Sequence, residues 1–219
     1  MSDDLDVQDW QPLTVPEAVS AMRGAACRWW IAGGWSIDLF LGRQTRDHAD
    51  TDVLVLTSEQ LAAQQHLSDW VLYKTKQPTP TKLALWPAEE YLAPETDIHD
   101  IWIKREVGGP WRFQLMFTED DADRWVFRRD RRIGGALADL GWTHPDGFEV
   151  LRPEVQLLYK ARPEARRSKD QADFESVADA LTPTARVWLA EALMKQYGPT
   201  HDWLPRLTTK ERFGTAESP

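Results

Sequence analysis

Two aspartates, Asp50 and Asp52, stand at the start of an apolar run at residues 53–56, and their type and spacing suit metal chemistry. Because successive side chains alternate across an extended strand, Asp50 and Asp52 point to one face and Thr51 to the other. Magnesium takes carboxylate oxygens and keeps its other positions for waters or phosphate oxygens. The pair therefore predicts a Mg²⁺ site whose remaining ligands come from a nucleoside triphosphate.

A glycine turn before the aspartates strengthens this hypothesis, because the pair alone is more often a solvated Asx-turn. Gly33 and Gly34 follow the apolar segment 28–32 and precede a helical pattern that begins at Trp35. Glycines there permit positive φ and let backbone amides approach phosphate, while the helix N-terminus adds a favourable partial charge. Ser36 adds a short hydroxyl donor. This order of elements makes nucleotidyl transfer the leading hypothesis.

The segment 30–52 holds both motifs in one register and resembles the aminoglycoside and lincosamide nucleotidyltransferases of the polymerase-beta-like superfamily. A second segment, 153–161 followed by 169–174, resembles the helical part after that family's sheet. The resemblance implies an α+β fold, with a mixed sheet flanked by helices and a C-terminal helical region. It also implies which residues contact the triphosphate and which bind magnesium: Gly33, Gly34 and Ser36, and Asp50 and Asp52, respectively.

The same resemblance implies a reaction, the transfer of a nucleoside monophosphate, AMP from ATP, to a hydroxyl of a small acceptor that is commonly an antibiotic. In this family a third carboxylate usually completes the site, as a metal ligand or as the base for the acceptor hydroxyl. If the predicted hairpin at residues 101–117 supplies it, the expected position falls near Gln114, which cannot ionise. Four neighbouring carboxylates are the alternatives, each an ordinary surface residue by default: Asp97, Asp100, Glu119 and Asp120. Without a third acid, a non-catalytic nucleotide-binding protein becomes a competing hypothesis.

Cationic side chains near these motifs are candidates for binding the triphosphate. We assign triphosphate binding to Arg46 and Lys160, because a guanidinium pairs bidentately with phosphate oxygens and an ammonium neutralises their charge. Arg43 and Lys169 have the same chemistry, and all four have the alternative of surface ion pairing. His48, two residues before the first aspartate, either positions a phosphate, orients a carboxylate or caps a turn.

The net charge and the composition indicate which classes of binding partner the protein favours. The net charge of −9 disfavours binding to nucleic acid, although the basic run 128–132 keeps a toxin-like transferase that modifies RNA as an alternative. An acidic surface favours a cationic acceptor. The twelve tryptophans read mainly as core residues, and Trp35, beside the diglycine, is the candidate for stacking on a nucleobase or sugar.

The segment lengths favour a cytoplasmic protein with no membrane partner. No apolar stretch approaches the length of a transmembrane helix, and the first residues, 1–6, are acidic where a signal peptide is basic and then apolar. The single cysteine, Cys27, lies among apolar neighbours and excludes an internal disulfide.

The hydrophobic pattern predicts a catalytic domain at residues 1–150, a helical region at 151–207 that packs on it, and a flexible tail at 208–219. We expect helices at 16–26, from 35, from 57, from 153, at 168–181 and at 183–197. We expect strands at 28–32, 50–56, 71–76, 83–86, 101–106, 111–117 and 125–129, with a turn at 77–80.

Overall fold

A mixed β-sheet forms the centre of the molecule in the computed structural model, which describes residues 6–75 and 83–209. The strands are β1 (Trp29–Ile31), β2 (Asp52–Leu56), β3 (Val71–Thr75), β4 (Ala84–Leu85), β5 (Asp100–Lys104), β6 (Phe113–Asp121), β7 (Arg124–Val126), β8 (Gly134–Ala136), β9 (Gly141–Thr143) and β10 (Glu149–Leu151). The helices are α1 (Val15–Met22), α2 (Gly33–Leu41), α3 (Gln60–His66), α4 (Pro153–Lys160), α5 (Ser168–Val177), α6 (Pro183–Tyr197) and α7 (Leu204–Thr208). Short 3₁₀ turns lie at Thr57–Glu59, Pro94–Thr96, Leu137–Asp139 and Pro163–Ala165.

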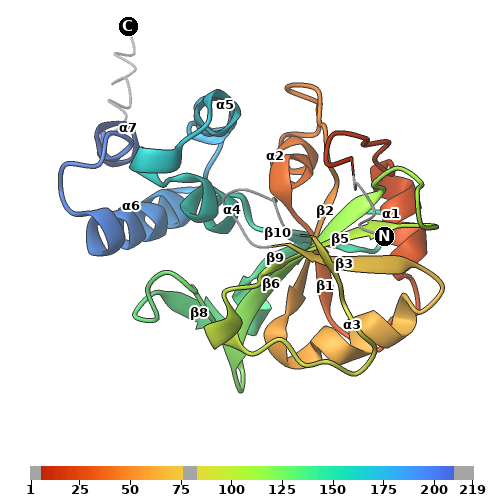
Figure 1. Cartoon of the computed structure of the whole chain (residues 1–219). Coiled ribbons are helices and arrows are strands. Elements are labelled where there is room, and N and C mark those ends of the chain that lie inside the picture. The colour runs from red at the N-terminus through yellow and green to blue at the C-terminus, as the bar shows by residue number, and fades with distance from the viewer. Residues whose placement is uncertain (1–5, 76–82, 210–219) are drawn as a thin grey trace, which may run out of the picture.

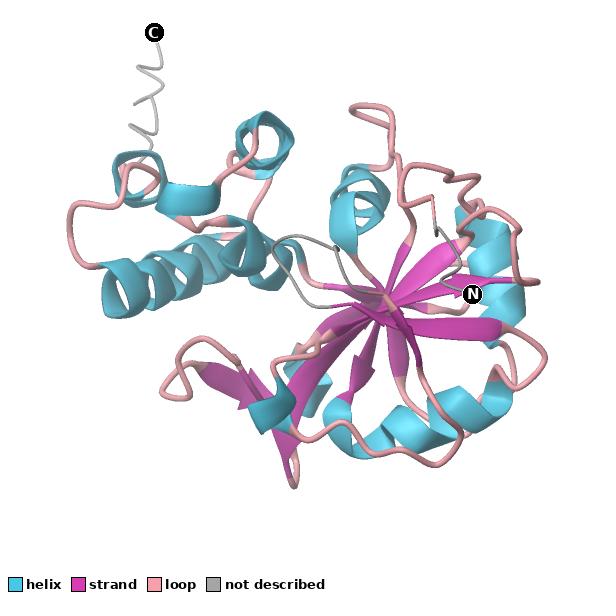
Figure 2. Cartoon of the chain, in the orientation of Figure 1, coloured by secondary structure: helices cyan, strands magenta, loops and turns pink. Residues whose placement is uncertain are grey.

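The strand order places β2 in the middle of the sheet. Among the described residues the order is β4-β3-β5-β6-β2-β1-β10-β9, with β7 pairing β6 and β8 pairing β7. β2 runs antiparallel to β1 and parallel to β6, and β10 runs parallel to β1. Figures 1 and 2 show the sheet with α4, α5, α6 and α7 grouped on one side of it. The α+β class with a mixed sheet and a helical C-terminal region is as predicted.

Both faces of β2 are buried, which explains its continuous apolar sequence. Val53 and Val55 belong to a hydrophobic cluster with residues of α1 and α3 on one face. Leu54 and Leu56 belong to a second cluster, which includes residues of α4, α5 and α6. A strand covered on both faces has no need of polar alternation. The side chains of Asp50 and Asp52 stand where this buried strand begins.

Several predicted elements are confirmed, with shifted ends. The hairpin is present as antiparallel β5 and β6, in which Ile101 pairs with Leu115. The first helix, predicted at 16–26, begins after a capping box of Thr14 and Glu17 and ends at Met22, where Arg23 becomes extended and Gly24 adopts a φ of 82°. The second helix begins at Gly33 rather than at Trp35.

Other boundaries differ more. The predicted strand at 125–129 ends at Val126, because Phe127 and Asp130 form a turn in which the Asp130 amide donates to the Phe127 carbonyl at 3.0 Å. The helix predicted at 168–181 ends at Val177. β8, β9 and β10 were not predicted, since each is three residues long and none has a long alternating pattern.

The proposed domain division has its first boundary, residue 150, inside β10, and one hydrophobic cluster contains residues from both sides of it. Residues 210–219 of the predicted tail and the turn predicted at 77–80 lie outside the described residues. Within the described ranges, none of the helices has the length and apolarity needed to cross a bilayer.

Candidate active site

The glycine turn lies against the first residue of β2. β1 ends at Ile31, Ala32 caps α2, and Gly33 opens the helix with a φ of 64°. A Cβ atom at Gly33 would lie 1.9 Å from Oδ2 of Asp52, so the carboxylate occupies the space that any other residue would fill. The backbone also joins the two segments, because the Ala32 amide donates to the Asp52 carbonyl at 2.9 Å. Gly33 is therefore required for both its φ and its missing side chain.

The neighbouring residues of the turn are held by protein contacts. A Cβ at Gly34 would lie 2.4 Å from Nη2 of Arg46 and from Nδ1 of His48, so both side chains pack directly on this glycine. Ser36 is fully buried and its hydroxyl donates to the Gly33 carbonyl at 2.9 Å. The Gly33 amide donates to Oε1 of Gln156 on α4 at 2.8 Å. These contacts fix the shape of the turn, and sequence reasoning did not identify Gln156.

The sheet register brings a third carboxylate to the face of Asp52. Asp52 pairs with Gln114, and Gln114 pairs with Trp102, so these three side chains point the same way. Asp100 precedes Trp102 by two residues and shares that face. Nε2 of Gln114 donates to Oδ1 of Asp100 at 3.3 Å. The candidate third carboxylate on this face is thus Asp100 of β5. Gln114, which occupies the position where the sequence led us to expect a carboxylate, lies between Asp52 and Asp100.

The other three candidates for the third acid make contacts elsewhere. Asp97 is exposed and pairs with His99 at 3.3 Å. Glu119 forms an ion pair with Arg131. Asp120 accepts hydrogen bonds from the amide and hydroxyl of Ser58, at 3.1 and 2.6 Å. The alternation of side chains along β5, combined with its pairing to β6, is the signal that selects Asp100 from the four.

Burial and mutual repulsion disfavour ionisation of these acids. Burial, followed by the charges of Asp50 and Asp100, raises the pKa of Asp52 to about 7, although Lys160 acts in the opposite direction. Burial also raises the pKa of Asp100 to about 6, against the lowering effect of Arg128 and Arg129. A divalent cation would remove the repulsion and favour the charged form.

The donor set fits magnesium bound together with a nucleotide. Within the described residues, no group of three or more histidine, cysteine, aspartate or glutamate side chains is arranged to enclose a metal ion. Magnesium does not require such a cage, since it commonly binds through one or two carboxylates, substrate phosphates and waters. Asp50, whose side chain is 33% exposed, and buried Asp52 provide two such carboxylates. Lys169 brings its ammonium within 4.0 Å of Oδ2 of Asp50.

Arg46 and Lys160 meet at a shared buried carboxylate, Asp173 of α5. Nε and Nη2 of Arg46 donate to the two oxygens of Asp173 at 2.7 and 3.0 Å. Nζ of Lys160 lies 2.9 Å from Oδ2 of Asp173 and 3.2 Å from Oδ1 of Asp170. Burial would raise the pKa of Asp173, but the hydrogen bond from Arg46 and the charge of Lys160 outweigh it and lower the pKa. The two cations are therefore preorganised beside the glycine turn by α5.

His48 pairs with a carboxylate that is not one of the metal candidates. Its Nε2 lies 2.5 Å from Oδ2 of Asp38, and the Thr45 hydroxyl donates to Oδ1 of Asp38, also at 2.5 Å. The ring of Trp35 lies 4.3 Å from the His48 ring, centroid to centroid. These contacts fasten the loop before β2 onto α2. They give His48 and Trp35 packing partners, and sequence reasoning did not identify Asp38.

The mixed sheet, with a glycine turn at a helix N-terminus that faces carboxylates on β2 and, across β6, on β5, has the nucleotidyltransferase fold of the polymerase-beta type. Residues 14–119 match the family model of aminoglycoside-2''-adenylyltransferases. This range contains the turn, both aspartates and Asp100. The match covers slightly less than half of the chain, so it shows a similarity of this segment to that family. Together with the fold, it indicates an enzyme that transfers nucleotidyl groups.

One solved structure supports this fold. The chain is similar to ANT(2'')-Ia in complex with adenylyl-2''-tobramycin, with 13% identity and a TM-score of 0.52, over 83% of this chain and 95% of that one. It also matches the lincosamide antibiotic adenylyltransferase LnuA, bound to lincomycin, with 16% identity and a TM-score of 0.49, over 78% of this chain and 100% of that one. None of the curated proteins matches the sequence. The first structure carries the comparison of fold, because its TM-score is the higher.

Proposed function

We propose that the protein is a Mg²⁺-dependent nucleotidyltransferase that moves a nucleoside monophosphate, AMP from ATP, to a hydroxyl of a small acceptor of the aminoglycoside or lincosamide type. The observation that carries this proposal is the shared face of Asp52, Gln114 and Asp100 beside the Gly33 turn. The family match of residues 14–119 supports the same chemistry.

Asp50 and Asp52 would hold the magnesium, which supplies positive charge to the triphosphate and its pyrophosphate leaving group. Because the Gly33 amide already donates to Gln156, we assign to Gly34, in the first turn of α2, the amide that approaches the phosphates. Lys160 and Arg46 add positive potential from behind the turn, where Asp173 holds both. Ser36 acts through the turn, by bracing the Gly33 carbonyl.

Asp100 is the proposed base. With a pKa of about 6 it is ionised at neutral pH and can accept the proton of the acceptor hydroxyl. The hydroxyl oxygen then bonds to the α-phosphorus while the bond to the bridging oxygen breaks and pyrophosphate leaves. Gln114 orients the carboxylate through its side-chain amide. This assignment removes the reason for favouring a non-catalytic nucleotide-binding protein.

The test is pyrophosphate release from each of the four nucleoside triphosphates with Mg²⁺, against aminoglycosides, lincosamides and a small structured RNA. We expect release with ATP that depends on one small acceptor. Asp100→Asn should lower kcat by about 10²-fold or more while leaving the affinity for ATP within about twofold. The control is Asp146→Asn, an exposed carboxylate in the turn between β9 and β10.

Two outcomes would contradict the proposal. An unchanged kcat in Asp100→Asn would show that Asp100 is not the base. Release that depends on RNA and not on any small acceptor would favour the RNA-modifying alternative. The structure offers that alternative little support, since in the basic run 128–132 Arg131 pairs with Glu119 and Arg132 with Asp130.

A further inference from the structure

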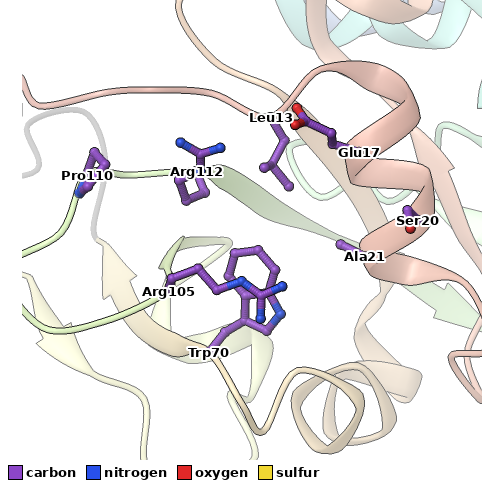
Figure 3. Close-up of a pocket in the computed structure, with 8 residues that line it drawn as sticks. All are labelled: Leu13, Glu17, Ser20, Ala21, Trp70, Arg105, Pro110 and Arg112. Atoms are coloured by element: carbon purple, nitrogen blue, oxygen red, sulfur yellow. The ribbon is translucent and has the colours of Figure 1, made fainter.

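A cavity of about 500 Å³ lies between α1 and the β5–β6 hairpin. This volume falls within the range of small-molecule sites. Its apolar lining comes from Leu13, Ala21, Trp70 and Pro110. Figure 3 shows Glu17, Ser20 and Ala21 of α1 on one side and the side chains of Trp70 and Arg105 across from them. Residues of the proposed catalytic face, Asp52, Gln114 and Asp100, are absent from its lining.

Two guanidinium groups give the cavity a positive character. The guanidinium of Arg105 lies 3.6 Å from the ring centroid of Trp70. Stacking on an indole leaves the in-plane N–H groups of an arginine available for an oxyanion. Arg112 also lines the cavity. Among the described residues, neither guanidinium has a hydrogen-bonded carboxylate partner.

The one carboxylate of the lining is already engaged. Oε2 of Glu17 accepts hydrogen bonds from the amide and the hydroxyl of Thr14, at 2.7 and 2.9 Å, in the capping box of α1. These hydrogen bonds lower the pKa of Glu17, with a smaller contribution from the charge of Arg112. The cavity therefore presents two cations against one anion, above an apolar floor. This combination suits a small organic anion.

Hydrogen bonds connect the wall of the cavity to the strand that carries the aspartates. The Leu13 amide donates to the Arg112 carbonyl at 2.7 Å, and the Leu13 carbonyl accepts from the Thr51 hydroxyl at 2.6 Å. Thr51 is fully buried between Asp50 and Asp52, and its own carbonyl accepts from the Gln114 amide at 2.9 Å. A ligand that moves Leu13 or Arg112 thus acts on the backbone behind the proposed metal site.

We propose that this cavity is a second binding site, for a small organic anion with a carboxylate or phosphate group and an apolar body, and that its occupancy is transmitted through Leu13 to Thr51. The anionic group binds Arg105 and Arg112, and the apolar body contacts Trp70, Leu13 and Pro110. The site lies apart from the catalytic face, and its binding does not depend on the proposed function.

The test is a titration of the ¹⁵N-labelled full chain with phenylacetate, phenyl phosphate and neutral phenylacetamide, followed by NMR. We expect saturable shifts of the Trp70 indole N–H with one or both anions in the millimolar range or below, and none with the amide. The double variant Arg105→Gln/Arg112→Gln should weaken binding about tenfold or more, because charge-assisted hydrogen bonds are lost. Arg23→Gln, at the exposed end of α1, is the matched control and should bind as the wild type does.

The same spectra test the connection to Thr51. Anion binding should shift the amides of Thr51 and Asp52, and Thr51→Val, which removes the hydroxyl, should abolish those shifts while the Trp70 shift persists. Absence of saturable binding by either anion, equal binding of phenylacetamide, or unchanged affinity in the double variant would overturn the site. If anion binding to the wild type shifted only resonances of residues that line the cavity, the proposed transmission from Leu13 to Thr51 would be wrong.

Discussion

Gly33 and Asp52 depend on each other at the residue scale. The glycine has a positive φ and lies so close to the Asp52 carboxylate that no side chain fits between them. A diglycine in sequence is common in turns, but here it has a steric reason that involves the residue proposed to bind the metal. This reason can be separated experimentally from the general strain of a positive φ.

Gly33→Ala should destabilise the protein by at least about 3 kcal/mol and remove nucleotide binding, because the strained φ adds to a displaced Asp52. Gly42→Ala is the control, since Gly42 has a φ of 66° and open space around its Cβ position. That variant should lose about 1 kcal/mol and keep its affinity for ATP. Chemical denaturation and calorimetric ATP titration measure both effects. Equal losses in the two variants would contradict the steric argument.

The raised pKa of Asp52 predicts a pH-dependent stability. Between pH 3.8 and about 7 the folded protein keeps a proton that the unfolded chain has lost, so this group lowers the free energy of unfolding as pH rises. Metal-free Asp52→Asn should therefore be more stable than the wild type at pH 8, by about 1–3 kcal/mol, and similar to it below about pH 4. Mg²⁺ with ATP should raise the Tm of the wild type more at pH 8 than at pH 6.

Thermal unfolding of both proteins across this pH range checks the sign. The exposed variant Asp146→Asn should show no comparable change with pH. A metal-free Asp52→Asn protein that is less stable than the wild type at pH 8 would show that the carboxylate is needed for packing. In that case, other groups of the folded protein would already compensate the negative charge of Asp52.

At the scale of elements, Asp173 ties three segments together. Arg46 comes from the loop between α2 and β2, Lys160 ends α4, and Asp173 lies on α5. The carboxylate is almost completely buried and touches both cations. Removing it leaves the buried ammonium of Lys160 and the half-buried guanidinium of Arg46 with fewer acceptors, which is more costly than the loss of an exposed pair.

Asp173→Asn should lower the free energy of unfolding by about 3 kcal/mol and loosen the loop that carries Arg46 and His48. Asp179→Asn, which breaks the more exposed pair with Arg206, is the matched control and should change stability by less than about 1 kcal/mol. Denaturant unfolding measures the stability, and hydrogen exchange of the amides at 43–49 reports the loop. Similar small effects in both variants would mean that solvent reaches Asp173.

At the scale of the whole molecule, the sheet and the C-terminal helices share one hydrophobic cluster. Trp30 and Leu54 of the sheet, Leu157 of α4 and Leu189 of α6 all belong to it. The helices also contribute Gln156 and Lys160 to the proposed site. The division at residue 150 therefore separates two regions of the chain that bury each other's apolar side chains.

The full chain should unfold in one transition, with equal calorimetric and van't Hoff enthalpies, because neither region keeps its buried surface without the other. A fragment of residues 1–150 should lack dispersed NMR resonances or bind a hydrophobic dye. Differential scanning calorimetry of the full chain and spectra of the fragment provide the test. Two separate transitions, or a well-folded fragment, would establish independent domains instead.

The sequence by itself determined the class of fold and predicted where the proposed site lies. Local signals sufficed for the glycine turn, the Asp-x-Asp strand, the hairpin and the helical C-terminal region, because each depends on backbone preferences and alternation over a few residues. The strands β8, β9 and β10 were not predicted. Each is too short to show a periodic pattern, and β10 pairs with β1, which lies far away in the chain.

Only the tertiary structure decided which distant side chains meet. Asp100 was one of four equal candidates until the register of β5 on β6 put it on the face of Asp52. Arg46 and Lys160 have a common partner in Asp173, which no spacing along the chain predicts. The physical reason is that strand register and helix packing are set by the burial of whole faces. A motif specifies the geometry of its own few residues and leaves their long-range partners open.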